Sequence, residues 1–140
     1  MTIQPAILIE MGVLLVALVT VESGGYFLTK VVRGTVPANK LQENFFRAGH
    51  AHAAVLLLLS FAILSVVGYT SLDGVLGFIA VNFVPAAALL MPAGFFLSVI
   101  GKDPQRPNRL IALLWIGAAS LTIGLLTVGV ALVVAGAGAI

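Results

Sequence analysis

The sequence predicts an all-α, polytopic membrane protein, a single transmembrane four-helix bundle that covers residues 1–140. Composition is the first reason, since 61% of the residues are hydrophobic and only 9% are charged. A soluble protein carries roughly 25% charged residues because its surface must face water. The second reason is that the polar residues are clustered and leave apolar runs of about 20 residues, the length that crosses a bilayer. We therefore expect the lipid bilayer to be the solvent for most of the surface.

Turn-forming residues divide the chain into four helices. Gly34 and Pro37 interrupt the first apolar run, and Asn39 followed by Gln42 has the pattern of a capping box that starts a helix. Residues 71–74 form a short polar link between the second and third runs. Each apolar run is expected to be helical, because the backbone groups of a segment in lipid must be paired internally. The predicted helices span residues 5–32, 40–69, 74–100 and 109–137.

The basic residues predict the orientation in the membrane. All seven lie in or near the first and third loops, and the second loop and both tails contain none. The positive-inside rule places basic loops in the cytoplasm, so we expect both termini on the outer side. The seven residues are Lys30, Arg33, Lys40, Arg47, Lys102, Arg106 and Arg109.

A row of mostly small residues runs along the predicted helix at 109–137. Small residues allow two helix backbones to approach closely, and this packing drives association in lipid. The row predicts a contact surface for another helix of the same chain, for a second copy or for a larger membrane partner; a pore-lining face is the alternative. Its members are Gly117, Ser120, Gly124, Thr127, Ala131, Val134 and Gly138.

Glu22 is the most informative single candidate for a site residue. Counting about 1.5 Å per residue from the basic boundary at Lys30 and Arg33 places it inside the hydrocarbon. A carboxylate there is costly unless it is paired, protonated or hydrated, so we expect Glu22 to face the bundle interior. Tyr26 lies one turn nearer the basic end on the same helix face. The alternative is a carboxyl that only fixes helix packing.

The second predicted helix begins with a polar group of Glu43, Arg47, His50 and His52. Glu43 and Arg47 are four residues apart and can pair, and His50 shares the face of Arg47. The two histidines are about 200° apart around a helix, so both cannot bind one ion from an intact helix. We therefore expect no metal and no haem between them. A cluster of Glu22 and Tyr26 with one histidine, with Arg47 at its mouth, is the candidate binding site.

The third predicted helix contains Pro85 and Pro92, two turns apart. Each proline removes a backbone donor and leaves the carbonyl four residues earlier without its helical partner. Asn82 lies one turn before Pro85 and is a candidate to satisfy a freed carbonyl. A static kink and a hinge or binding-site carbonyl are both consistent with this pattern.

Three segments resemble stretches of small bacterial inner-membrane proteins: residues 45–52 (FFRAGHAH), 91–98 (MPAGFFLS) and 103–108 (DPQRPN). The resemblance implies a multi-pass protein of the bacterial inner membrane. It implies no activity and no functional residues.

Three functions remain open. The leading hypothesis is an oligomeric, proton-sensitive transporter or channel-like protein that uses Glu22 and a nearby histidine. The second is a non-catalytic accessory or assembly subunit of a larger membrane complex, and the third is a redox subunit that binds haem or a quinone. No catalytic residue and no cofactor is expected, because the sequence has no cysteine, phosphate loop or pairing of nucleophile and base. Nucleic acid is not expected as a partner, since no basic stripe is interleaved with aromatic residues.

Overall fold

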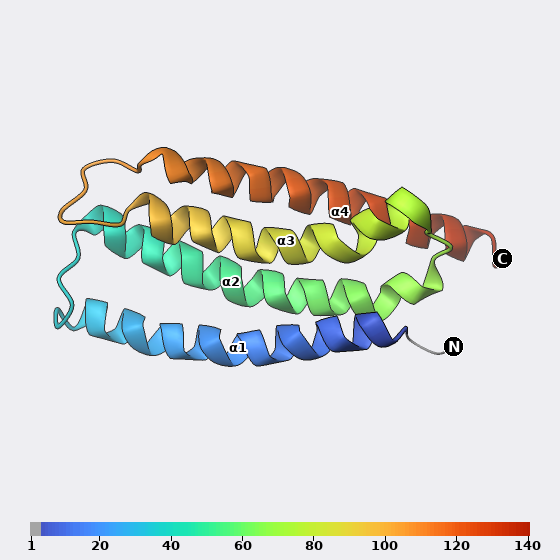
Figure 1. Ribbon diagram of the computed structural model, residues 1–140, viewed down its shortest axis with the longest axis horizontal. Coiled ribbons are helices and arrows are strands. Elements are labelled where there is room, and N and C mark those ends of the chain that lie inside the picture. Colours follow the sequence, from blue (N-terminus) through green and yellow to red (C-terminus); the bar gives the residue numbers. More distant parts are fainter. Residues whose placement is uncertain (1–3) are drawn as a thin grey trace.

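The computed structural model describes residues 4–140 and contains four long helices, each long and apolar enough to cross a membrane (Figure 1). The helices are α1 (Pro5–Val32), α2 (Lys40–Val66), α3 (Gly74–Ser98) and α4 (Ala112–Ala137). A short 3₁₀ helix, η1 (Val67–Tyr69), extends α2, and a second one, η2 (Arg109–Ile111), precedes α4. These bounds support the all-helical fold and the four apolar segments expected from the sequence.

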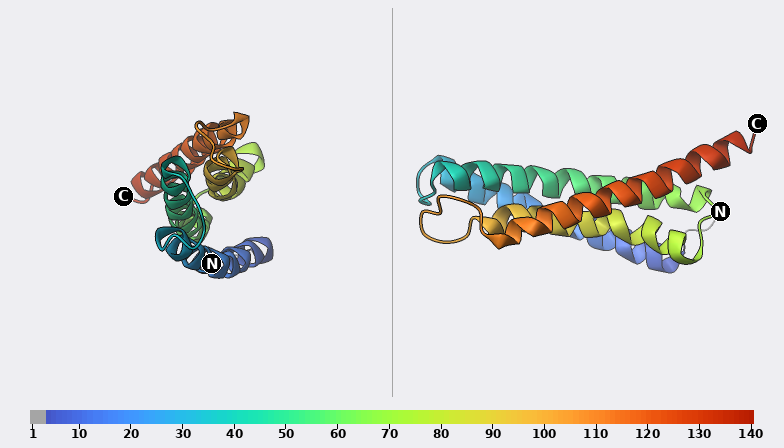
Figure 2. Two further views of the ribbon diagram at one scale, coloured as in Figure 1. Left: turned by 90° about the vertical axis from the view of Figure 1, so that its left-hand side faces the viewer. Right: turned by 90° about the horizontal axis from the view of Figure 1, so that it is seen from above.

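The helices follow one another as an antiparallel series that curls into an open C when viewed along its long axis (Figure 2). α3 packs most extensively on α4, and α2 packs on both α3 and α1. Within residues 4–140, α1 and α4 form no extended contact with each other. The first and last helices are therefore the edges of the C, and each packs along one side only.

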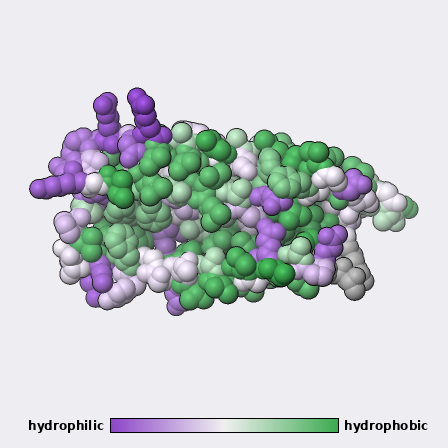
Figure 3. All heavy atoms as spheres, viewed as in Figure 1, coloured by the Kyte–Doolittle hydropathy of each residue, from purple (hydrophilic) through white to green (hydrophobic). Residues whose placement is uncertain are grey.

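The core lies between α2 and its two neighbours. One buried cluster contains Leu14 of α1, Leu56 and Leu57 of α2, and Ala88 and Met91 of α3. Burying such side chains stabilises an assembly by close packing even where lipid replaces water. Apolar side chains also cover much of the outer surface along the helices. Hydrophilic side chains gather at the end that carries the α1–α2 and α3–α4 loops (Figure 3).

Glycines bring α4 close to α3. A Cβ added at Gly117 would lie 2.6 Å from Met91 Cγ, and one at Gly124 would lie 2.8 Å from Val84 Cγ2. Ser120 lies between them and donates a hydrogen bond to the Phe83 carbonyl (2.8 Å). The first half of the small-residue row is thus occupied within the chain. α4 then diverges from the other helices, as Figure 2 shows, and the far end of the row is exposed.

The predicted capping box at the start of α2 is confirmed. The Asn39 side chain accepts a hydrogen bond from the Gln42 backbone, and the Gln42 side chain accepts one from the Asn39 backbone. Gln42 then reaches the end of α3, where Nε2 donates to the carbonyls of Val99 (3.1 Å) and Gly101 (3.0 Å). Asn39 Nδ2 donates to Asp103 Oδ1 (2.8 Å) and to the Pro104 carbonyl (2.7 Å). The two loops are therefore joined at one end of the molecule.

Three helix ends differ from the sequence prediction by a few residues. α2 tightens into η1 because the Val67 carbonyl accepts bonds from both the backbone and the hydroxyl of Thr70, three residues later. α3 ends at Ser98, where Asn108 provides partners for the last carbonyls of the helix. The Asn108 backbone N–H donates to the Ser98 carbonyl, and its side-chain amide donates to the Leu97 carbonyl. The last helical segment begins as the 3₁₀ turn η2, which Asn108 caps because its side chain accepts a hydrogen bond from the Leu110 backbone N–H.

Candidate functional site

Glu22 lies on the exposed side of α1, ten residues before the last residue of that helix, Val32. The prediction that it faces the bundle interior is wrong for the single chain. The residue before it, Val21, packs against the core, and each step along a helix turns the side chain by about 100°. Glu22 is thereby rotated off the contact with α2. Its distance from the end of α1 is about 15 Å at 1.5 Å per residue.

His50 is the polar side chain of α2 that lies against α1. A Cβ added at Gly24 would lie 3.4 Å from His50 Nδ1, and one at Gly25 would lie 3.6 Å from both Cε1 and Nε2. The imidazole therefore lies directly against both glycines, and a methyl group at either position would make ordinary van der Waals contact with it. Gly25 is three residues from Glu22, so His50 packs within about one helical turn of that carboxyl.

His52 faces the opposite way and packs on α3. Its Nδ1 lies 2.8 Å from the Ala48 carbonyl, and its ring centroid is 4.9 Å from that of Phe95. The divergence of His50 and His52 follows from their spacing on one helix. Both cannot be axial ligands of one haem held by this chain. Among the described residues, no group of three or more potential metal ligands comes together.

Tyr26 and Arg47 both lie on the surface. The Tyr26 ring is 65% exposed and carries Lys30 Nζ over it at 4.5 Å from its centroid, a cation–π contact. Glu43 pairs with Lys40 (Nζ to Oε2, 3.2 Å) rather than with Arg47. Arg47 therefore does not close a cluster with Glu22, although Tyr26 lies one turn from Glu22 on the same side of α1.

Asn82 does not join this group, and it does not bond to a carbonyl freed by proline. Its Nδ2 donates to the Phe78 carbonyl, one turn back along its own helix (2.9 Å). The carbonyls that lack a helical partner because of Pro85 and Pro92 belong to Val81 and Ala88. The Asn82 amide points toward the start of α3 and therefore bonds to neither of these two carbonyls.

The candidate site that remains is a short polar strip on α1, made by Glu22 and Tyr26 with His50 inserted against Gly24 and Gly25. A carboxyl and an imidazole both exchange protons, and an imidazole does so near neutral pH. Comparisons with protein-family models, curated proteins and solved structures found no match. The resemblance to bacterial inner-membrane proteins accordingly stays an expectation.

Sequence reasoning missed how the phenylalanines near the basic loops are used. The structure packs these side chains between helices. Phe46 of α2 contacts Phe27 of α1 (5.4 Å between ring centroids) and Phe96 of α3 (5.7 Å). Gly49 makes the approach of α3 feasible, since a Cβ there would lie 2.8 Å from Phe96 Cε2. The glycine one turn after the phenylalanine pair was the signal in the sequence.

Proposed function

We propose that this chain is a multi-pass membrane protein that works as an oligomer, with a proton-sensitive site for transport at Glu22 and His50. The observation that carries the proposal is the uncovered carboxyl of Glu22, well inside an apolar helix, with His50 packed about one turn away. A polar group at this depth is costly when it faces lipid, and such residues in membrane helices mark proton and substrate pathways.

The exposed face of α1 supports association through this helix. Leu15, Val19 and Tyr26 share the face of Glu22 at spacings of three and four residues and are at least half exposed. A second copy in the same orientation would meet this face at the same depth and would cover the carboxyl. Because α3 already occupies Gly117 and Gly124, the α4 row offers only its far end, around Val134, to a partner.

A proton-flux measurement tests the proposal. The protein is reconstituted in liposomes that contain a pH-sensitive dye, and a potassium diffusion potential drives protons inward. We expect flux above that of empty liposomes, and we expect Glu22→Gln to abolish it because an amide cannot exchange a proton. The matched control is Glu10→Gln, which neutralises a half-buried carboxyl of the same helix and should retain the flux. Equal flux in wild type and Glu22→Gln would refute the role of Glu22.

A second candidate, an accessory subunit of a larger membrane complex, is favoured by the open C. Its two edge helices, α1 and α4, each pack along one side only, so a partner of another sequence could cover Glu22 equally well. Native mass spectrometry of gentle detergent extracts separates the two functions. Complexes whose masses are multiples of this chain support the oligomer, and a stoichiometric second protein supports the accessory subunit.

A further inference from the structure

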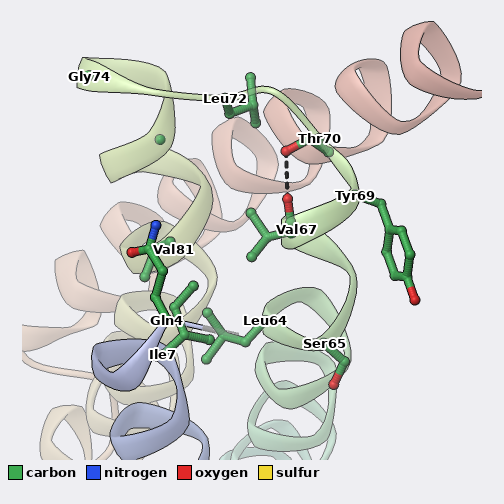
Figure 4. Close-up of a pocket in the computed structure, with 12 residues that line it drawn as sticks. Gln4, Ile7, Leu64, Ser65, Val67, Tyr69, Thr70, Leu72, Gly74 and Val81 are labelled. Carbon is green, nitrogen blue, oxygen red and sulfur yellow. Dashed lines mark hydrogen bonds between the residues drawn. The ribbon is translucent and has the colours of Figure 1, made fainter. Parts of the chain in front are cut away.

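A second site lies at the opposite end of the molecule from the basic loops. There the first turn of α1, the junction of α2 with η1 and the first turns of α3 enclose a cavity of 510 Å³ (Figure 4). This volume lies within the range of about 300–1,000 Å³ that is typical of small-molecule sites. The cavity is separate from the strip at Glu22, because no α1 residue beyond Ile7 is among the described residues that line it.

The local sequence explains why this space stays open. Gly68, Gly74 and Gly77 contribute no side chain to the wall, and η1 replaces the last turn of α2. Gly74 has a φ of +51°, in the left-handed region that glycine adopts without strain. The link between α2 and α3 can therefore bend tightly over the cavity, and it adds Leu72 as the large side chain of this part of the wall.

The wall has an apolar part and polar groups. Ile7, Leu64 and Val81, which belong to the buried core cluster or pack against it, form the apolar part. Gln4 and Thr70, which lie just outside the apolar segments, add polar side chains. Such a wall matches an amphipathic molecule, with its apolar body against the core residues and its polar head near the helix ends.

The hydrogen-bonding groups define the head. Gln4 precedes α1, and its side chain makes no capping hydrogen bond. Figure 4 shows this amide extending from α1 into the space beside α3, whereas the Tyr69 ring points away from the other lining side chains. The Thr70 hydroxyl donates to the Val67 carbonyl (2.7 Å), so its lone pairs remain free to accept. A carbonyl or hydroxyl oxygen of a ligand can accept from the Gln4 amide, and a hydroxyl can also donate to Thr70.

Charge excludes ionic ligands. None of the twelve described residues that line the cavity is acidic or basic, so among residues 4–140 a charged head would find no counter-ion in the wall. We propose that this cavity binds an uncharged membrane amphipath, with a hydrocarbon body against Ile7, Leu64 and Val81 and a hydroxyl- or carbonyl-bearing head at Gln4 and Thr70. Neutral glycerolipids and quinones share this chemistry.

Competition binding to the purified full chain tests the site. The probe is a fluorescent short-chain diacylglycerol, and the competitors are unlabelled diacylglycerol, decylubiquinone and decanoate. We expect saturable binding that both uncharged competitors displace, and decanoate, which carries a carboxylate, should be at least tenfold weaker. Stronger competition by diacylglycerol assigns a glycerolipid, and stronger competition by decylubiquinone assigns a quinone; either order upholds the site.

Two variants and one control locate the binding. Val81→Phe places a ring in the cavity and should weaken binding at least tenfold, whereas Val75→Phe, on an exposed part of α3 outside the cavity, should leave it unchanged. Gln4→Leu, at an exposed position that does not affect folding of the core, should weaken binding roughly three- to tenfold by loss of one hydrogen bond. The proposal is overturned by absence of saturable binding, by equal potency of decanoate, or by wild-type affinity in Gln4→Leu together with equal effects of the two phenylalanine variants.

Discussion

The side chain of Gln42 joins two segments that are distant in sequence. It is only 7% exposed, its Oε1 accepts from the Asn39 backbone (3.1 Å), and its Nε2 donates to the carbonyls of Val99 and Gly101. Buried carbonyls need partners, and those at the end of a helix have none within it. One amide therefore both caps the start of α2 and satisfies the end of α3.

Gln42→Leu should destabilise the protein more than any exposed polar-to-leucine change on the same helix. Leucine keeps most of the volume and removes all three side-chain hydrogen bonds, and each buried group left unpaired costs about 1–3 kcal/mol. The free energy of unfolding in mixed detergent and sodium dodecyl sulfate measures the loss. Asn44→Leu, at an exposed position two residues later, is the control and should change this free energy little. Equal losses in the two variants would show that the amide bonds contribute nothing specific.

At the scale of the elements, the contact between α3 and α4 depends on glycine at three positions, Gly94 of α3 and Gly117 and Gly124 of α4. Gly117 and Gly124 are buried against the backbone and side chains around Met91 and Val84. The Ser120 hydrogen bond to the Phe83 carbonyl crosses the same contact. Close approach of backbones replaces the hydrophobic drive that helices lack in lipid.

Gly124→Leu should therefore separate α4 from α3. Its Cβ alone would lie 2.8 Å from Val84 Cγ2 and 3.2 Å from the Val84 backbone nitrogen, so the helix must move. Overpacking of this kind costs roughly 1–3 kcal/mol. The control is Gly129→Leu on the same helix, where no atom lies within 4 Å of an added Cβ. Thermal unfolding in detergent should show a lower midpoint for Gly124→Leu alone, and a similar drop in Gly129→Leu would instead indicate that α4 is covered on both sides.

The helices could be predicted from the sequence because their causes are local. Apolar runs, the Asn39–Gln42 box and the turn residues placed the four elements within a few residues. The end of α3 depended on Asn108, whose side-chain bond to the Leu97 carbonyl joins residues 11 apart in the sequence. The direction of a side chain such as Glu22 depends on which face of α1 meets α2, and no local signal sets that rotation.

The candidate site was predictable in part for the same reason. The spacing of His50 and His52 separated them before any neighbour was known, because residues two apart on one helix always differ by about 200°. The pairing of His50 with Gly24 and Gly25 needed the packing of two helices. The hydrogen-bond partner of Asn82 is also local, but the sequence prediction chose the wrong carbonyl. The Asn82 amide bonds to the Phe78 carbonyl, one turn back, and not to a carbonyl that a proline leaves unpaired.

At the scale of the whole molecule, the two loops at one end form a single basic surface. Asn39 bonds to Asp103 and Pro104, so the α1–α2 loop and the loop after α3 are held together. All seven basic residues of the chain lie in or near these loops, and the link between α2 and α3 at the other end has none. Figure 3 shows hydrophilic side chains gathered at this end. Lipid-spanning helices with such an asymmetry are expected to keep the basic end in the cytoplasm.

Labelling of single cysteines tests this orientation, and the chain has no cysteine of its own to interfere. Cysteine at Gln105, in the basic loop, should be protected in intact cells from a membrane-impermeant thiol reagent, whereas cysteine at Ser71, in the short link, should react. Both side chains are exposed, so accessibility in the folded chain does not distinguish them. Permeabilised cells provide the control, in which both positions should react equally. Because helices that each span the bilayer once must alternate in direction, Thr35→Cys should behave as Gln105→Cys does. Labelling of Gln105→Cys in intact cells with protection of Ser71→Cys would reverse the orientation, and different results for Thr35→Cys and Gln105→Cys would mean that one helix does not cross the membrane.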